Sequence, residues 1–590
     1  MIVARRVYQY GIAFATVWTI VVGLSGLLEV ALEAVAESAA GPFVTSGRLV
    51  YADRVSYFGA LTGIGLLFWT IHWLLAARAV RRDEIVERRS AVRKLYLYGV
   101  LFVGGLILTF AVDRLLEDAL RVVFGLATRA DLLDGSLIPQ LAMLVSAGTF
   151  WTYHARVVQR DRAVAPELGR GATVRRWCVY GLAFIGLMIL LFASVGLVDT
   201  LVSLALTSGG ASIDNGQWLA ASIADRGATM LAGLMLWLAP WIWSSRLFAL
   251  QAGTDLERDS TLRKVYLYAV LLTAVSWTVW NAAQVLYVLL RAVLIPSEAG
   301  GLWNTVQSDL SRTVAYALVF GTAWAYHARV VSREATAATE RHRQATIRWI
   351  YGYLVAIVGA ITFGAGLGGI VNTAVEVVAI PGVNQGAHWW QEQLALYGTM
   401  ILVGLPVWLI PWTRLQREVV ATVARRSLAR RVYLFLALGI TVLTLVGTGA
   451  YTLYQLLRVA LGERWTVSNT SDAIDAISAA LVAGLLLAYH LRVLQRDAAL
   501  ASSDEAAAAE SVPATPTPLL PKAATPAHDT VTLLVVRPPA GDAATDLRER
   551  IQAILPPGAT VETVQVPTDE VERLLAASPL PSHGHSTEGV

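Results

Sequence analysis

The sequence has little charge and almost no cysteine. Only 15% of its 590 residues are Asp, Glu, Lys or Arg, and 56% are hydrophobic, whereas soluble domains carry about 25% charged residues. This composition excludes a soluble globular enzyme, and it equally excludes a disordered or collagen-like chain. The single cysteine, Cys178, excludes a disulfide framework and any cysteine-based metal or iron–sulfur site.

Motifs of catalysis are also missing. The chain has no phosphate-cradling glycine-rich loop ending in Lys-Ser/Thr, no nucleophile elbow and no His-Glu-x-x-His. No Asp, Glu, Lys or Arg stands at the middle of any long apolar stretch, although charges at such positions mark proton relays and ion paths. We therefore expect a protein that is not an enzyme and does not couple transport to protons.

Long apolar stretches dominate what is present. Because about 20 apolar residues in a helix cross the roughly 30 Å core of a bilayer, the sequence predicts twelve transmembrane helices. The first is a retained span, since it is longer than the apolar region of a signal peptide. The twelve stretches are 7–28, 56–77, 95–112, 138–155, 177–198, 227–245, 265–290, 313–328, 349–375, 393–413, 432–457 and 477–491.

One short pattern opens every odd-numbered stretch. It consists of one or two basic residues followed by aromatic residues two positions apart, and it returns every 82 to 88 residues. Each unit therefore holds two spans. The six copies are Arg5 to Tyr10, Arg93 to Tyr98, Arg175 to Tyr180, Arg263 to Tyr268, Arg348 to Tyr353 and Arg430 to Phe435.

The returning spans alternate between two types, which reveals a longer period. Spans four, eight and twelve end in Tyr-His-x-Arg, whereas spans six and ten end in Trp-x-x-Pro-Trp and span two in Trp-x-x-His-Trp. The duplicated module thus holds four helices and about 170 residues, and it occurs three times. An even number of spans gives all modules the same orientation, so these are parallel repeats.

The composition changes after the last span. A linker rich in Ala, Pro and Thr is followed by a predicted βαβα piece of about 50 residues. That piece is marginal as an independent core, which favours a partner or a second copy of itself.

The expected fold is all-α and membrane-embedded, with a small C-terminal α/β piece. The domains are module 1 (1–174), module 2 (175–345), module 3 (346–497), a linker (498–528), the βαβα domain (529–577) and a disordered tail (578–590).

Basic residues predict the orientation. The loops after the even spans, with the flanks of the first and last span, hold 32 Lys and Arg, whereas the opposite loops hold 10. The positive-inside rule therefore places both termini in the cytoplasm. The net charge of +4 reflects this anchoring and not nucleic-acid binding. Abundant Ala and Arg with only three Lys are typical of a GC-rich bacterium, so we expect the bacterial cytoplasmic membrane.

Four histidines are the only candidates for cofactor binding: His72, His154, His327 and His490. Facing histidines hold haem between helices in some bundles. The competing interpretation places them in water near the inner interface without a ligand, and we favour it. Because no partner stands at a clear ligand spacing, we expect no cofactor and no metal.

Two further patterns have a membrane interpretation. The Arg and Tyr of the repeated openings are typical of anchoring, because Arg reaches lipid headgroups and Tyr prefers the interface. A headgroup or ligand site at the same residues is the alternative. A glycine cluster in the ninth span favours close helix packing over an unwound stretch; its members are Gly364, Gly366, Gly368 and Gly369.

With its repeated Arg-x-x-Tyr-x-Tyr openings, the chain resembles a bacterial family known only as a domain of unknown function. That family consists of membrane units of two to four helices, often in tandem, and the resemblance covers about residues 1–497. Cys178 and Phe435 depart from the Tyr-x-Tyr pattern. The resemblance implies neither an activity nor functional residues.

These features favour a non-enzymatic membrane scaffold or partner-binding protein. Besides the lipid bilayer, we expect a protein partner or self-association through the C-terminal tail. A passive channel or transporter for a small solute, along the interface between repeats, is the alternative. A haem-bearing membrane redox protein is a weaker one.

Overall fold

The structure is a computed structural model. The chain divides into two units, Met1–Ala509 and Glu510–Val590. The predicted βαβα domain, the tail and residues 511–528 of the linker lie outside the described residues. The structure describes residues 2–510 except 41–47, 129–130, 132–136, 168, 207–213, 251–256, 258–259, 297–298, 338–341, 381–385, 387, 420–421, 426 and 463.

The described residues form helices and no strand. Twelve of these helices have 28 residues or more, and each predicted span lies within one of them. The long helices are α1 (Ile2–Ala40), α2 (Arg48–Arg82), α4 (Ala91–Val123), α6 (Leu137–Val164), α7 (Arg170–Leu206), α8 (Asp214–Leu250), α9 (Thr261–Leu294), α10 (Ala299–Ala337), α11 (His342–Ala379), α12 (Trp389–Glu418), α14 (Leu428–Ala460) and α15 (Val467–Glu510); α3 (Glu84–Arg88) and α13 (Thr422–Arg425) are short.

Ten of the long helices are long and apolar enough to cross a membrane. The other two are α6 and α10, whose uncharged stretches are limited to residues 137–155 and 313–328. The chain is therefore a multi-pass membrane protein. Helix α15 runs on to Glu510 and covers the first thirteen residues of the expected linker. This segment is rich in Ala and has no proline before Pro513, so it favours a helix.

Serine residues set the start of two helices. The Ser260 hydroxyl accepts a hydrogen bond from the Arg263 backbone N–H (3.2 Å), and Ser427 accepts one from Arg430 (3.4 Å). Such a cap satisfies an otherwise unpaired donor of the first turn. It also fixes the register of the arginine three residues later, which matters for the site described below.

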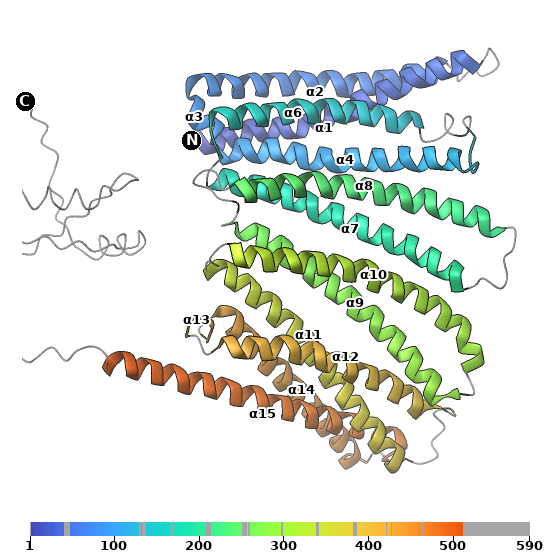
Figure 1. Ribbon diagram of the computed structural model, residues 1–590, viewed down its shortest axis with the longest axis vertical. Helices are drawn as coiled ribbons and strands as arrows, with labels where there is room; N and C mark the ends of the chain where they lie inside the picture. The colour runs from blue at the N-terminus through green and yellow to red at the C-terminus, as the bar shows by residue number, and fades with distance from the viewer. Residues whose placement is uncertain are drawn as a thin grey trace, which may run out of the picture. The chain divides into compact units, whose positions relative to one another are not determined.

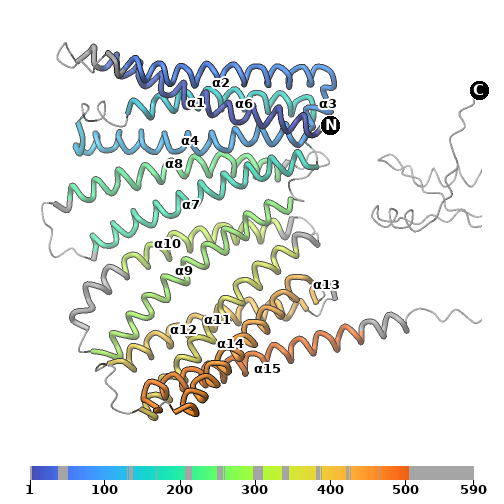
Figure 2. Tube along the Cα trace, turned by 180° about the vertical axis from the view of Figure 1, so that it is seen from behind, coloured from blue at the N-terminus to red at the C-terminus, as the bar shows by residue number. Residues whose placement is uncertain are grey.

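Helices α1 and α2, α4 and α6, α7 and α8, α9 and α10, and α11 and α12 pack as hairpins (Figures 1 and 2). Side-chain hydrogen bonds join α14 to α15. Helix α1 contacts α2, α4 and α6; α7 contacts α8, α9 and α10; and α11 contacts α12 and α14. Successive modules meet where α4 contacts α7 and α8, and where α9 contacts α11 and α12. The two junctions therefore use equivalent helices.

Each module has its own hydrophobic core. The clusters are centred on paired tyrosines, Tyr10 with Tyr96 in the first and Tyr180 with Tyr266 in the second. The third cluster contains Tyr353, Tyr433 and three buried tryptophans, Trp349, Trp408 and Trp412. In each unit at least one tyrosine of the opening thus points into the protein, whereas Tyr8 of the first opening is exposed.

Glycines bring the two helices of an odd hairpin into backbone contact. A Cβ atom on Gly366 would lie 2.8 Å from Met400 Cβ and 2.9 Å from the Ile401 nitrogen, and one on Gly186 would lie 2.5 Å from the Trp237 nitrogen. Helix α11 is continuous through its glycine cluster. The glycines there allow close packing, and the helix does not unwind.

Candidate functional site

A polar cluster recurs at one end of each module, which we call the basic end because the Arg-rich helix starts lie there. In module 1, Trp69 and Trp73 stand one turn apart on α2. Trp69 Nε1 donates a hydrogen bond to the Tyr96 hydroxyl of α4 (3.1 Å). Trp73 Nε1 donates one to the Tyr153 hydroxyl of α6 (2.6 Å). The two indoles therefore join three helices.

His154 completes this chain of hydrogen bonds. Its Nδ1 atom lies 2.7 Å from the Phe150 carbonyl oxygen, and its Nε2 atom lies 2.7 Å from the Tyr96 hydroxyl. A carbonyl oxygen only accepts, so Nδ1 carries the proton and Nε2 accepts from Tyr96. Both nitrogens of the neutral imidazole are therefore occupied.

A buried ion pair lies next to the histidine. Arg93 Nε donates to Asp161 Oδ2 (2.7 Å), and Arg93 Nη1 donates to the Tyr10 hydroxyl (3.1 Å). Tyr10 in turn donates to Glu87 Oε1 (3.0 Å), while the Arg93 guanidinium lies 5.4 Å from the centre of the Trp73 ring. Because each charge has an opposite charge and hydrogen bonds, the burial cost is offset.

Modules 2 and 3 repeat the arrangement. The distance from His Nε2 to the Tyr hydroxyl is 3.3 Å at His327 and 3.2 Å at His490. We call the Trp, Tyr, His, Arg and acidic residues of each module its basic-end cluster. The clusters comprise Trp69, Trp73, Arg93, Tyr96, Tyr153, His154 and Asp161; Trp237, Trp241, Arg263, Tyr266, Tyr326, His327 and Glu334; and Trp408, Trp412, Arg430, Tyr433, Tyr489, His490 and Asp497.

The structure corrects the expectation that these histidines are wet. His154, His327 and His490 are 0%, 1% and 2% exposed. In module 1 the neighbouring Tyr153 binds Trp73, and Asp161, seven positions after the histidine, binds Arg93, so this face of α6 points inward. Each histidine lies in its own module, so the structure does not bring the three together.

His72 is placed differently. Its Nδ1 atom lies 2.7 Å from the Phe68 carbonyl oxygen, and its ring contacts the rings of Phe68 and Tyr8. It stands where the equivalent helices carry Pro240 and Pro411. The four candidate histidines therefore lie in two different environments. Among the residues that the structure describes, no group of three or more His, Cys, Asp or Glu is arranged to hold a metal.

The anchoring interpretation of the helix openings is wrong for their buried basic residues. Lys94 Nζ lies 2.9 Å from Glu167 Oε1. Arg175 contacts both Glu167 (3.2 Å) and Glu257 (3.1 Å). These side chains form ion pairs within the protein and do not extend to lipid headgroups. Trp177, by contrast, is exposed.

The acidic partners of the cluster arginines were not predicted from the sequence. Asp161, Glu334 and Asp497 each stand seven residues after a repeated histidine. Two turns of a helix separate such positions, so both side chains lie on the same face. This recurring spacing was a signal in the sequence that would have identified them.

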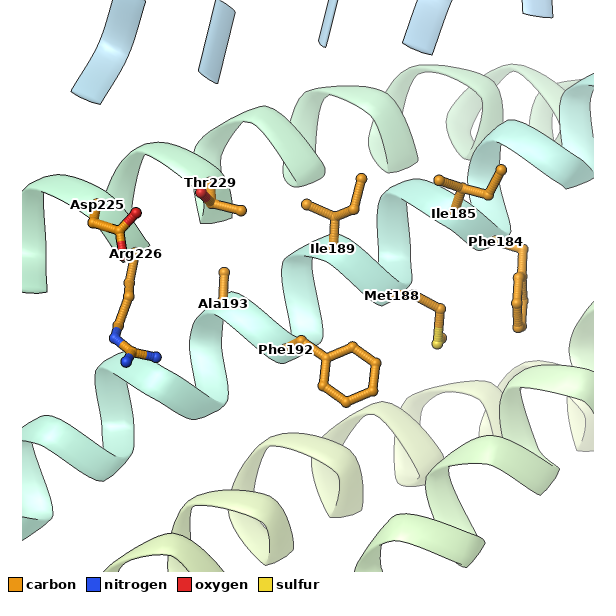
Figure 3. A pocket seen from close by; sticks show the side chains of 9 residues that line it. All are labelled: Phe184, Ile185, Met188, Ile189, Phe192, Ala193, Asp225, Arg226 and Thr229. Carbon is orange, nitrogen blue, oxygen red and sulfur yellow. The ribbon is translucent and has the colours of Figure 1, made fainter. Parts of the chain in front are cut away.

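A second feature is a pocket of about 490 Å³ in module 2 (Figure 3). Its apolar wall comes from α7 and includes Phe184, Met188 and Phe192. Asp225 and Arg226 of α8 lie at one end of it. The pocket thus combines a long apolar surface with one carboxylate and one guanidinium.

Comparison with known proteins adds one match. The model of a family described as a domain of unknown function (DUF5671) matches residues 6–149, 176–300 and 350–485, in three tandem copies. No curated protein matches the chain. No solved structure matches it either.

Proposed function

Since the chain belongs to the family of the domain of unknown function DUF5671, whose description carries no activity, we propose a function from the structure: a non-enzymatic membrane scaffold. In this proposal the three modules form a rigid membrane platform. The segment after Glu510 is its contact with a cytoplasmic partner, and lipid surrounds the helices.

The proposal includes a topology of twelve spans. Helices α6 and α10 each pack inside a four-helix module between helices that are apolar enough to cross, which supports a transmembrane position for them as well. The excess of basic residues at one end supports cytoplasmic termini. The composition supports the inner membrane of a bacterium.

One observation carries the scaffold proposal: the polar groups of the basic-end clusters bind each other. In module 1, His154 has both ring nitrogens occupied, and Arg93 binds Asp161 and Tyr10. A catalytic or ligand-binding group needs a donor or acceptor directed at the substrate. The clusters instead join the helices of each module, which is the chemistry of a structural support.

Two alternatives have less support. A haem would need the Nε2 atom of His154, which accepts from Tyr96; we expect purified protein to lack a Soret band. A channel or transporter would use a path along the helices, and the pocket beside Phe192 is the nearest candidate. Its lining comes only from α7 and α8, so by itself it forms no route between modules.

Reconstitution into liposomes separates a scaffold from a channel. We expect proteoliposomes to show the same glycerol permeability and ion leak as protein-free liposomes, measured by stopped-flow light scattering and a potential-sensitive dye. Addition of a pore-forming peptide serves as the positive control. Solute entry that increases with protein density would overturn the scaffold in favour of a channel.

Cross-linking in native membranes tests the partner contact. The full chain is compared with a chain that ends at Glu510, the last residue of α15. We expect a specific cross-linked partner with the full chain and its loss with the shortened chain, at equal levels in the membrane. If the same partner remains bound to both chains, the contact does not lie in the C-terminal segment.

A further inference from the structure

The two junctions between modules are built from the same contact. At the first, Leu120 of α4 lies over Gly227 of α8, where a Cβ atom would stand 4.0 Å from the leucine Cδ1. At the second, Leu290 of α9 lies over Gly398 of α12 at 3.8 Å. At these distances a Cβ atom would make an ordinary van der Waals contact, so each leucine packs directly on the glycine position of the next module. The junction is therefore a repeated leucine-on-glycine contact.

Other contacts at the junctions also fall at equivalent positions. At the basic end, Cys178 Sγ donates to the Tyr98 carbonyl oxygen (3.4 Å) at the first junction. At the second junction, the rings of Tyr351 and Tyr268 occupy these positions, with centres 5.3 Å apart.

The opposite end of the second junction carries an ion pair. Arg291 Nη2 of α9 lies 2.9 Å from Glu392 Oε1 of α12. Both side chains are partly exposed, so the pair contributes mainly to the register of the two modules.

The outer faces of modules 1 and 3 carry the two halves of this junction. Leu457 of α14 corresponds to Leu290 and is 52% exposed. Gly59 of α2 corresponds to Gly398, and a Cβ atom there would have no neighbour within 4 Å. Phe435 and Tyr8 correspond to the ring pair at the second junction, and both are 61% exposed. No helix among the described residues covers either face.

Charge is also complementary between these faces. Arg458 of α14 stands at the position of Arg291, and Asp53 of α2 stands at the position of Glu392. A lipid tail would not require opposite charges at matching heights. These faces thus preserve the pattern of a protein–protein junction.

We propose that a second copy of this chain occupies each face, with α14 of one copy against α1 and α2 of the next. All modules point the same way, so a copy added by the internal repeat lies in the same membrane with the same orientation. The contact joins two different surfaces, and such a head-to-tail contact continues into a row or closes into a ring. The inference stands on the junctions and does not depend on the scaffold function.

Disulfide cross-linking in membranes tests this contact. The variants are Tyr8→Cys, Phe435→Cys and the double variant, and the native Cys178 is buried. After mild oxidation we expect the double variant to form a ladder of dimers, trimers and larger species. Co-expressed single variants should give dimers only, because each chain then carries one end of the contact. Each single variant alone should remain monomeric.

A control pair of cysteines measures the cross-linking that chance encounters between chains produce. Val145→Cys with Leu318→Cys places cysteines on exposed residues of α6 and α10, away from both end faces. A ladder no stronger than in this control, or equal amounts of dimer from each single variant alone, would overturn the proposal.

Charge reversal at the junction gives a second readout. Asp53→Arg should weaken association by up to about fivefold, the usual limit for an exposed ion pair. Adding Arg458→Asp should restore it; failure to restore it counts against the register.

Discussion

Tyr96 lies at the centre of the first basic-end cluster, where it connects an indole to an imidazole. Its hydroxyl accepts from Trp69 and donates to His154. Tyr96→Phe removes this hydroxyl but keeps the ring, so the buried His154 Nε2 and the partly buried Trp69 Nε1 lose their partner. An unsatisfied buried group costs about 1–3 kcal/mol. We therefore expect a lower Tm of the purified protein in detergent, measured by a thermal unfolding scan.

Tyr8→Phe is the control for this prediction. Tyr8 is in the same repeated motif, yet its side chain is exposed. We expect its Tm to match that of the native chain. Equal losses for both variants would show that the hydroxyl of Tyr96 has no special structural role.

At the residue scale, the sequence predicted which residues recur in the repeats better than it predicted whether their side chains are buried. The repeat identified His154 and its two equivalents, but not that they are buried. Proximity to the predicted interface suggested water, whereas burial depends on partners such as Asp161, which lies 68 residues after Arg93. Such contacts between helices follow from packing and are not encoded in a hydropathy profile.

At the element scale, two glycines of α11 give opposite expectations. A Cβ atom on Gly366 would come within 3 Å of Met400 and Ile401, whereas one on Gly368 would meet nothing within 4 Å. Gly366→Ala should therefore force α11 away from α12 and lower the Tm. Gly368→Ala should raise or preserve it, because Ala favours a helix over Gly by about 1 kcal/mol.

The two substitutions use the same chemistry two residues apart, so each controls for the other. Thermal unfolding scans at equal detergent concentration compare the Tm of the two variants. A higher Tm for Gly366→Ala than for Gly368→Ala would contradict the described packing of α11 on α12.

Apolar length predicted the existence of the long helices but not their ends. All twelve predicted spans lie within helices. The helices extend further, as α15 does to Glu510, because backbone hydrogen bonds continue wherever propensity allows. An apolar window reports only the part of a helix that is suited to lipid. Helix contacts depend on individual residues such as Gly366, where a Cβ atom would collide with α12 and for which the sequence indicated only close packing.

At the scale of the whole molecule, the topology can be tested by labelling. Leu461→Cys lies just after α14 at a residue that is 87% exposed, and Ala499→Cys lies near the end of α15. A membrane-impermeant maleimide should label the first in intact spheroplasts and the second only after permeabilisation. The native chain is the blank, because Cys178 is buried. Labelling of both sites before permeabilisation contradicts cytoplasmic termini.

Neighbouring modules share their buried charges. Glu167 follows the last helix of module 1, yet it binds Lys94 of that module and Arg175 of the next. Arg175 also reaches Glu257, which follows α8. Separating the first two modules would leave buried charged side chains without their partners on both sides, and an uncompensated buried charge is strongly destabilising. The repeats therefore resemble the links of a cooperative array, in which the folding of each unit raises the stability of its neighbour.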